Sequence, residues 1–359
     1  MNSGRDFMEN NAMLNSYKRN LARKRIILIV LILLMVLFFL LSVSIGSSNM
    51  SLIDVCKAIL RIGDEDNILI IYNIRLPRAL AAIIAGGGLA ISGAIMQNVL
   101  KNPMASPSTL GVSNASVFGA NLAIIVFGAG SYSAANHMIA IDNPYIVSIM
   151  SFVFALLSVG VILLLARFKH FRSESIVLAG VAIGTIFQAG TTLIQFFSVN
   201  EDLSTAVFWT FGNLNRATYR DDLIMLIIVL LGLGYFLYKR WDYNAISGGS
   251  DFATSLGVNV ERTTIISLLF ASLITAVCVS FLGIIGFVGL IAPQIMKKFI
   301  GDDFRYLIPT SFFFGTNLLL VSDLLGRVVI NGGSLPVGAI TSLLGGPMFI
   351  YLLLRERDR

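Results

Sequence analysis

The sequence predicts an all-α membrane protein whose helices cross the bilayer about ten times. This prediction rests on composition, on the spacing of apolar runs and on the distribution of charge. Hydrophobic residues make up 56% of the 359 residues and charged residues 13%, and the mean hydropathy is +0.83. Soluble domains carry roughly 25% charged residues. Too few charges are therefore present to cover a water-facing surface, and most of the chain must meet lipid.

Ten apolar runs have the composition of membrane-spanning helices, which need about 20 mostly apolar residues. The first run is longer than the roughly 7–15 apolar residues of a cleaved signal peptide, so we expect a retained span. The division between the seventh and eighth runs, near Gly283 and Gly286, is the least defined. In chain order the runs cover about 26–46, 79–97, 110–128, 145–166, 176–197, 223–238, 263–283, 285–300, 306–322 and 336–354.

The charge distribution predicts the orientation. With the N-terminus in the cytoplasm, 19 of the 26 Lys and Arg fall on the cytoplasmic side of ten spans. Lys and Arg collect on that side of membranes, so the count supports ten spans with both termini in the cytoplasm. The predicted organisation is a flexible or interfacial cytoplasmic tail (1–25), one membrane domain (26–355) and a short cytoplasmic tail (356–359).

Four connecting segments are long enough to carry structure of their own. We expect 47–78 to be a polar outer segment and 129–144 an outer loop. The outer segment 198–222 is amphipathic enough for a short surface helix. Its aromatic residues Phe208, Trp209 and Phe211 are interpreted as an interfacial belt, with packing near the outer mouth of the path as the alternative. The longest cytoplasmic connection, 239–262, contains a stretch of about two helical turns that Gly257 can end.

The sequence carries few groups that could do chemistry. No Lys, Arg, His or carboxylate lies in the middle of a predicted span, which argues against proton coupling because proton-driven transporters keep a titratable group in the membrane. No phosphate-binding loop and no pattern of catalytic or metal-ligating residues is found. The residues alone therefore indicate a passive conduit or a transport subunit, with an ion-coupled transporter or an intramembrane enzyme as the competing classes.

Glycine is frequent inside the predicted spans. Gly180 and Gly184 lie four residues apart on one face of the fifth span. Small residues let membrane helices approach closely, so helix packing is the simplest interpretation. A wall that flexes or lines the path of a bulky solute is the alternative.

Six segments, in one order over about 75–355, resemble the permeases of the FecCD/BtuC family, which belong to type II ATP-binding-cassette importers. The resemblance covers nearly the whole predicted membrane domain. Any one of the segments is a weak signal, but six in order are specific. The segments are RLPRALAAIIAGGGLAISGAIMQ (75–97), KNPMASP running into LGVS (101–113), LAGV (178–181), SLGVNV (255–260), GFVGLIAPQIMKKFIGDDFRYLIP (286–309) and LPVGAIT with LLGGPMFIYLLLR (335–355).

This resemblance implies a BtuC-like homodimer in a bacterial or archaeal cytoplasmic membrane, with a path along the dimer axis. Two copies of a separate ATPase subunit would use ATP and Mg, and an extracytoplasmic binding protein would deliver the solute. The chain would be a transport subunit rather than an enzyme and would bind no cofactor or metal itself. The implied cargo is a ferric siderophore or similar iron complex. Haem or vitamin B12 is the alternative, and an ion-coupled secondary transporter is a more distant one.

The resemblance also assigns roles to particular residues. Three outer arginines would bind acidic residues of the binding protein, since Arg can hold a carboxylate in a bidentate manner; interfacial snorkelling is the competing interpretation. A loop at about 241–260 would carry the coupling helix that contacts the ATPase, with an ordinary surface helix as the alternative. The docking residues are Arg75, Arg78 and Arg327, and the coupling residues are Gly249, Asp251, Phe252, Leu256, Gly257 and Val258.

The cytoplasmic gate is implied at Asn102 and Met104, after the second span, and at Ser173 and Glu174, at the start of the fifth. Glu174 departs from the small hydroxyl residues common in the family. In a homodimer, two Glu174 carboxylates facing each other across the dimer axis would repel in a dry constriction. Glu174 therefore either points aside or marks a different gate. Gln294 stands where the family commonly has His, and the sequence gives it no role.

Overall fold

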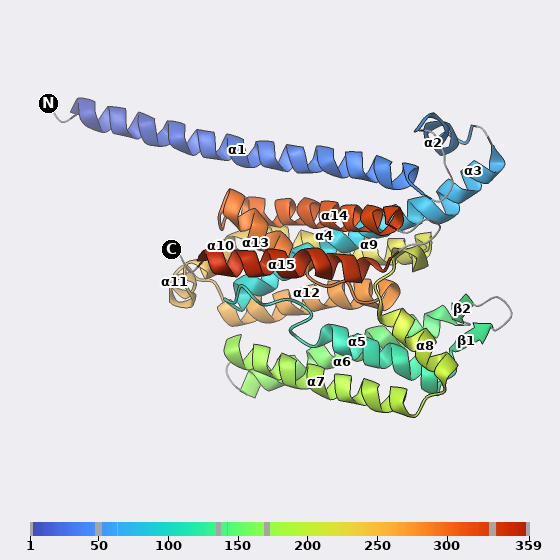
Figure 1. Cartoon of the computed structure of the whole chain (residues 1–359). Helices are drawn as coiled ribbons and strands as arrows, with labels where there is room; N and C mark the ends of the chain where they lie inside the picture. Colours follow the sequence, from blue (N-terminus) through green and yellow to red (C-terminus); the bar gives the residue numbers. More distant parts are fainter. Residues whose placement is uncertain are drawn as a thin grey trace.

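The computed structural model describes residues 3–46, 52–62, 64–133, 138–141, 143–168, 173–329 and 335–356. Helices form one bundle, with α1 (Ser3–Ser44) lying along α14 (Phe304–Val328) at its edge (Figure 1). The end that carries α10 and α11 is called the inner end below, and the opposite end the outer end, after the predicted orientation. Helix α1 begins and α15 ends at the inner end (Figure 1).

Each of the ten predicted spans corresponds to a helix of the described chain. Besides α1 and α14, these are α4 (Leu76–Val99), α5 (Val112–Asn121) with the π-helical turn η2 (Leu122–Val126), α6 (Pro144–Phe168), α7 (Ser173–Phe196), α9 (Tyr219–Tyr238), α12 (Val260–Leu282), α13 (Val288–Ile300) and α15 (Val337–Glu356). Seven of the described helices are long and apolar enough to cross a membrane. The fold is therefore an all-α, multi-pass membrane protein, and the number of spans stays a prediction.

The three shorter candidates for spans are α5 with η2, α13 and α15. Helix α13 has 13 residues and is about 20 Å long at 1.5 Å per residue, less than the roughly 30 Å hydrocarbon core. Its preceding segment turns sharply, since Gly283 has φ +80° and Phe287 has φ +65°. The expected division between the seventh and eighth runs is therefore a stretch of non-helical backbone between α12 and α13. It is packed inside the protein, where irregular backbone is tolerated at membrane depth.

The segments that flank the first spans are largely helical. Residues 3–25, expected to form a flexible or interfacial tail, are part of the continuous helix α1. The outer segment 47–78 contains α2 (Leu52–Ile59), α3 (Glu65–Ile70) and the π-helical turn η1 (Ile71–Arg75), and α3 and η1 run without a break into α4. The second span is therefore part of a helical segment that reaches from Glu65 to Val99.

The other connections are also structured. Strands β1 (Gly130–Ser133) and β2 (Met138–Ile141) pair antiparallel, with Gly130 opposite Ile141, in the segment expected to be a loop. Helix α8 (Asn200–Thr210) is the expected short outer helix. Trp209 is only 3% exposed and packs in a small outer cluster, which favours the packing alternative for this residue, whereas Phe208 and Phe211 are 54% and 42% exposed. The remaining elements are η3 (Leu214–Arg216), α10 (Arg240–Ser247) and α11 (Ser250–Ser255).

Helix α4 lies at the centre of the bundle. In the most apolar stretch of 65–99, 89% of residues are buried, against 17% for α1. A Cβ on Gly93 would stand 1.7 Å from the carbonyl oxygen of Gly289 in α13, and one on Gly86 would stand 2.6 Å from that of Gly315 in α14. The hydrophobic effect does not drive helices together in lipid, so their association depends on such close backbone contacts.

We predict that Gly93→Ala forces α4 and α13 apart and destabilises the protein. Overpacking a tight contact costs typically 1–3 kcal/mol, and here the clash is with backbone rather than with a movable side chain. The melting temperature of the purified protein in detergent should fall clearly. Gly234→Ala in α9 is the matched control, because its Cβ would meet nothing within 4 Å; equal melting temperatures for the two variants would contradict this packing account.

Candidate functional site

The outer end contains a buried cluster of three charges. Nε and Nη2 of Arg78, on α4, both lie 2.8 Å from Oδ1 of Asp323, on α14. Nη2 of Arg327, one turn further along α14, lies 2.7 Å from Oδ2 of the same carboxylate. The Asp323 side chain is fully buried, and the two arginines are 7% and 8% exposed. One carboxylate therefore holds two guanidinium groups and joins α4 to α14.

Arg327 and Arg75 bind the last carbonyl groups at the outer end of α1. Nη1 of Arg75 donates to the carbonyls of Val43 and Ser44, at 2.8 and 2.7 Å. Nη1 of Arg327 donates to those of Ser42 and Ile45, both at 2.8 Å. The last carbonyls of a helix lack partners within the helix and carry the negative end of its dipole, so these cations satisfy the C-terminus of α1.

Arg216 likewise caps the C-terminal end of α8. It donates to the carbonyls of Phe208 and Trp209, each at 2.8 Å, and its guanidinium lies over the Trp209 ring. Desolvation by burial lowers the pKa of Arg216 to about 10, so it remains charged at neutral pH. Arginines on the outer side of a membrane run against the usual charge bias, and the need to cap these helix ends accounts for several of them.

The docking assignment of Arg75, Arg78 and Arg327 stays a prediction. The structure gives all three intramolecular partners and buries most of each side chain. Substitution at these positions would therefore disturb the outer end of the fold as well as any contact with a binding protein. A docking experiment is better directed at exposed outer cations such as Arg61 and Arg220.

The inner end presents α11 where the coupling helix is predicted. Gly249 (φ +123°) precedes it and Gly257 (φ +82°) follows it, and nothing lies within 4 Å of a Cβ at either glycine. Phe252 and Leu256 are 54% and 61% exposed. Asp251 is exposed as well, while Val258 is half-buried. These two apolar side chains, four residues apart, thus form an exposed apolar face at this end of the bundle.

Hydrogen bonds tie α10 and α11 to the end of α4. Nζ of Lys101 lies 2.6 Å from Oγ of Ser250, the first residue of α11. Oγ of Ser247 donates to Oδ1 of Asn98 at 2.8 Å, and Nδ2 of Asn98 donates to the carbonyl of Tyr243 at 3.1 Å. A displacement of α11 would therefore be passed directly to the loop after α4 through Lys101, and to α4 itself through α10.

That loop carries the predicted gate residues Asn102 and Met104. Oδ1 of Asn102 accepts a hydrogen bond from the Met104 amide at 2.9 Å, and the Met104 side chain is 49% exposed. Gln294, which the sequence left without a role, donates to Oε1 of Gln97 at 2.9 Å and to the carbonyl of Pro103 at 3.1 Å. Gln294 therefore fastens the gate loop to α13.

The second pair of predicted gate residues lies in the first turn of α7. Ser173 is half-buried and Glu174 is exposed. Nothing in the described chain pairs with Glu174 to hold it over a path, so the gate assignment of all four residues stays a prediction.

Gly180 and Gly184 lie where α7 packs against the turn that begins α5. A Cβ on Gly180 would stand 2.8 Å from Cα of Leu110, and one on Gly184 would stand 3.2 Å from Cα of Gly111. Nδ2 of Asn114 also donates to the Gly184 carbonyl at 3.2 Å. The geometry favours the packing interpretation of these glycines.

Sequence reasoning missed Gln97, Asn98 and Asp323. Their signal was a polar side chain at either end of an apolar helix, but their partners lie far away in the chain and could not be identified from spacing. Within the part of the chain that the structure describes, no group of three His, Cys, Asp or Glu residues is placed to hold a metal ion.

Comparison with known proteins identifies the class. The chain is 48% identical to a Methanocaldococcus jannaschii protein named as an ABC transporter permease, over 96% of this chain and 98% of that one. It is 32% identical to the hemin transport system permease of Yersinia pestis, over 89% and 94% of the two chains. Residues 33–355 match the FecCD transport family. The chain belongs to this family of ABC transporter permease subunits.

A solved structure agrees with the fold. It is described as an inward-facing conformation of a metal-chelate type ABC transporter, and it superposes with a TM-score of 0.78 at 26% identity. The match covers 92% of this chain and 99% of that one. The likeness therefore extends over most of this chain and nearly all of the other.

We predict that Asp323→Asn destabilises the outer end. The change leaves the buried guanidinium groups of Arg78 and Arg327 facing each other without their shared carboxylate, and breaking a buried ion pair in this way costs about 3–5 kcal/mol. Thermal unfolding of the purified protein in detergent measures the effect. Asp66→Asn, at an exposed position in α3, is the control and should change stability by no more than about 0.5 kcal/mol; a variant at 323 as stable as this control would refute the role of the cluster.

Proposed function

We propose that the chain is the permease subunit of an ATP-driven importer for a ferric siderophore or similar iron complex. In this proposal two copies form the path, two ATPase subunits bind the inner ends through α11, and an extracytoplasmic binding protein delivers the complex at the outer ends. The membrane would be the cytoplasmic membrane of a bacterium or archaeon.

The observation that carries the permease role is the exposed helix α11 of a FecCD family chain. Its Ser250 is hydrogen-bonded to Lys101 in the loop after α4, and Ser247 of the neighbouring α10 is hydrogen-bonded to Asn98 of α4. A rigid helix between two glycines can move as a body when a partner pushes it. Hydrogen bonds to the inner end of α4 would transmit that movement to the predicted gate loop.

The support for an iron complex comes from similar proteins. The relative from Yersinia pestis is named for hemin transport and the solved structure for a metal chelate. Haem is therefore the second candidate. In this proposal the binding protein, rather than this chain, selects the iron complex.

Uptake into vesicles tests the proposal. The chain, the ATPase subunit and the binding protein encoded with it are reconstituted together, and the entry of a labelled ferric hydroxamate, hemin and cobalamin is followed with ATP supplied to the ATPase. We expect ATP-dependent entry of the ferric siderophore. Entry of hemin or cobalamin alone would overturn the cargo and leave the permease role intact, whereas an ATPase that never associates with this chain would overturn the permease role.

A substitution in the coupling segment tests the role of α11. We predict that Gly257→Val lowers transport-linked ATP hydrolysis severalfold, because a β-branched residue is strained at φ +82° and would change how α11 ends. Gly128→Val is the matched control. It has φ +65° and equally open surroundings but lies at the outer end. Stimulated hydrolysis at the level of this control would count against the coupling role.

A further inference from the structure

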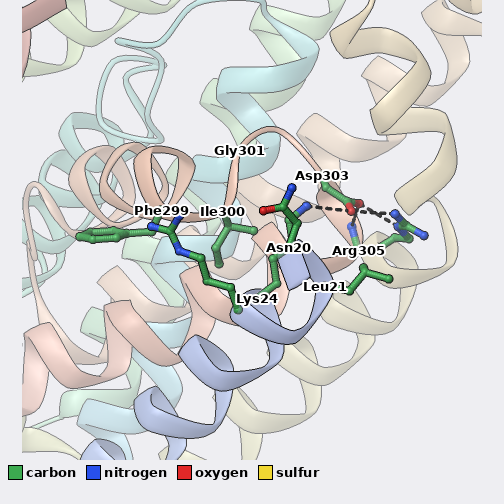
Figure 2. A pocket seen from close by; sticks show the side chains of 9 residues that line it. Asn20, Leu21, Lys24, Phe299, Ile300, Gly301, Asp303 and Arg305 are labelled. Carbon is green, nitrogen blue, oxygen red and sulfur yellow. Dashed lines mark hydrogen bonds and ion pairs between the residues drawn. The ribbon is translucent and has the colours of Figure 1, made fainter. Parts of the chain in front are cut away.

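A charged pocket lies at the inner end between α1 and the turn that joins α13 to α14. Its volume is about 390 Å³, and Asn20, Leu21, Arg23 and Lys24 of α1 form one wall. Figure 2 shows Lys24 and Arg305 reaching toward Asp303 from opposite sides, with Phe299, Ile300 and Gly301 completing the pocket. The family assignment and the proposed transport function make no use of this pocket.

The pocket carries more positive than negative charge. Asp303 is its one acidic lining residue; it accepts from Lys24 at 3.3 Å and from Nε and Nη2 of Arg305 at 2.9 and 2.8 Å. Although burial opposes ionisation, the hydrogen bonds from Arg305 and Lys24 lower the pKa of Asp303 to about 2. Arg23 is exposed at the mouth and has no ion pair or hydrogen bond with any described residue. A strong cation thus remains free for an anionic ligand.

The pocket lies at the level where the helices pass from polar to apolar sequence. On α1 the change occurs between Arg25 and Ile26, while α13 ends at Ile300 and α14 begins at Phe304. Exposed aromatic rings mark the same level: Phe299 is 52% exposed, and Trp241, 56% exposed, lies 4.8 Å from the guanidinium of Arg305. Aromatic side chains and cations of this kind gather at the headgroup region of a bilayer.

An exposed apolar stripe continues from Arg23 along α1. Residues 3, 7, 10 and 14 positions further on share one face of an α-helix with it. These are Ile26, Val30, Leu33 and Leu37, which are 59%, 46%, 63% and 49% exposed. A ligand with an anionic head at Arg23 would therefore have its apolar part beside this stripe, a surface that a free phosphate or a nucleotide would leave uncovered.

We propose that this pocket binds the phosphate of an anionic membrane lipid, with Arg23 as its principal ligand and the acyl chains lying along the stripe of α1. Basic pockets between transmembrane helices on the cytoplasmic side are suited to such headgroups. Lys24 and Arg305 contribute positive potential while their bonds to Asp303 keep the pocket in shape. Bound lipid would fill the pocket between the inner part of α1 and the turn that joins α13 to α14.

The test compares two substitutions that remove the same charge from the same helix. Arg23→Gln changes the pocket, whereas Arg25→Gln alters an exposed residue two positions away, about 200° around α1, that does not line it. The full chain in mixed micelles is titrated with phosphatidylglycerol, with phosphatidylcholine and with inorganic phosphate. Retained lipid per protein and the shift in melting temperature are measured.

We expect wild-type protein and Arg25→Gln to prefer phosphatidylglycerol, and Arg23→Gln to bind it about fivefold more weakly, as one basic residue contributes about 1 kcal/mol toward an anionic lipid. Equal losses in both variants would show a diffuse charge effect and overturn the proposal. No preference of the wild type for phosphatidylglycerol would overturn it as well. Stabilisation by inorganic phosphate to the same extent would show a site for free anions and would overturn the lipid assignment.

Discussion

The bundle depends on how closely its neighbours approach α4. Helices surrounded by lipid gain little from hiding apolar side chains, because the lipid is equally apolar. Backbone contacts at Gly86 and Gly93 bring α14 and α13 against α4 without intervening side chains. Helix α4 can therefore serve as a fixed central element, and features at its two ends are held in a defined relation to one another.

The outer end of α4 is held by a buried ion pair, and its inner end is held by hydrogen bonds between uncharged groups. Arg78 joins Asp323 in a buried ion pair at one end, and Gln97 and Asn98 connect to α13 and α10 at the other. The outer ion cluster resists movement because separating it would leave charges buried without partners. The inner hydrogen bonds are individually weaker, so the inner end is the better place for the movements that coupling to an ATPase requires.

Much of the architecture could be predicted from the sequence. The apolar runs locate ten helices, and the glycines at 249 and 257 locate the short helix between them. Contacts between distant residues could not be predicted in this way. Arg78 and Asp323 are 245 positions apart, and no spacing rule connects them, so the internal ion pair could not be predicted beside the docking role that the family resemblance implies.

Two further differences between the expectation and the structure concern local sequence. The basic composition of 1–25 is typical of a surface tail, and residues 3–25 continue the helix of the first span. Trp209 has the amphipathic ring of a belt residue, but Arg216 satisfies the carbonyls at the end of α8 and lies over the ring, which lets the ring pack inside. For Trp209, tertiary contacts therefore outweighed the preference of the local sequence.

The most direct test of this account asks where the energy for transport comes from. In sealed vesicles that hold this chain with its ATPase and binding protein, ionophores abolish the proton and sodium gradients while ATP is kept constant. The account predicts that uptake continues and that vesicles with this chain alone take up nothing. Uptake that stops with the gradients, or that proceeds without the ATPase, would contradict it.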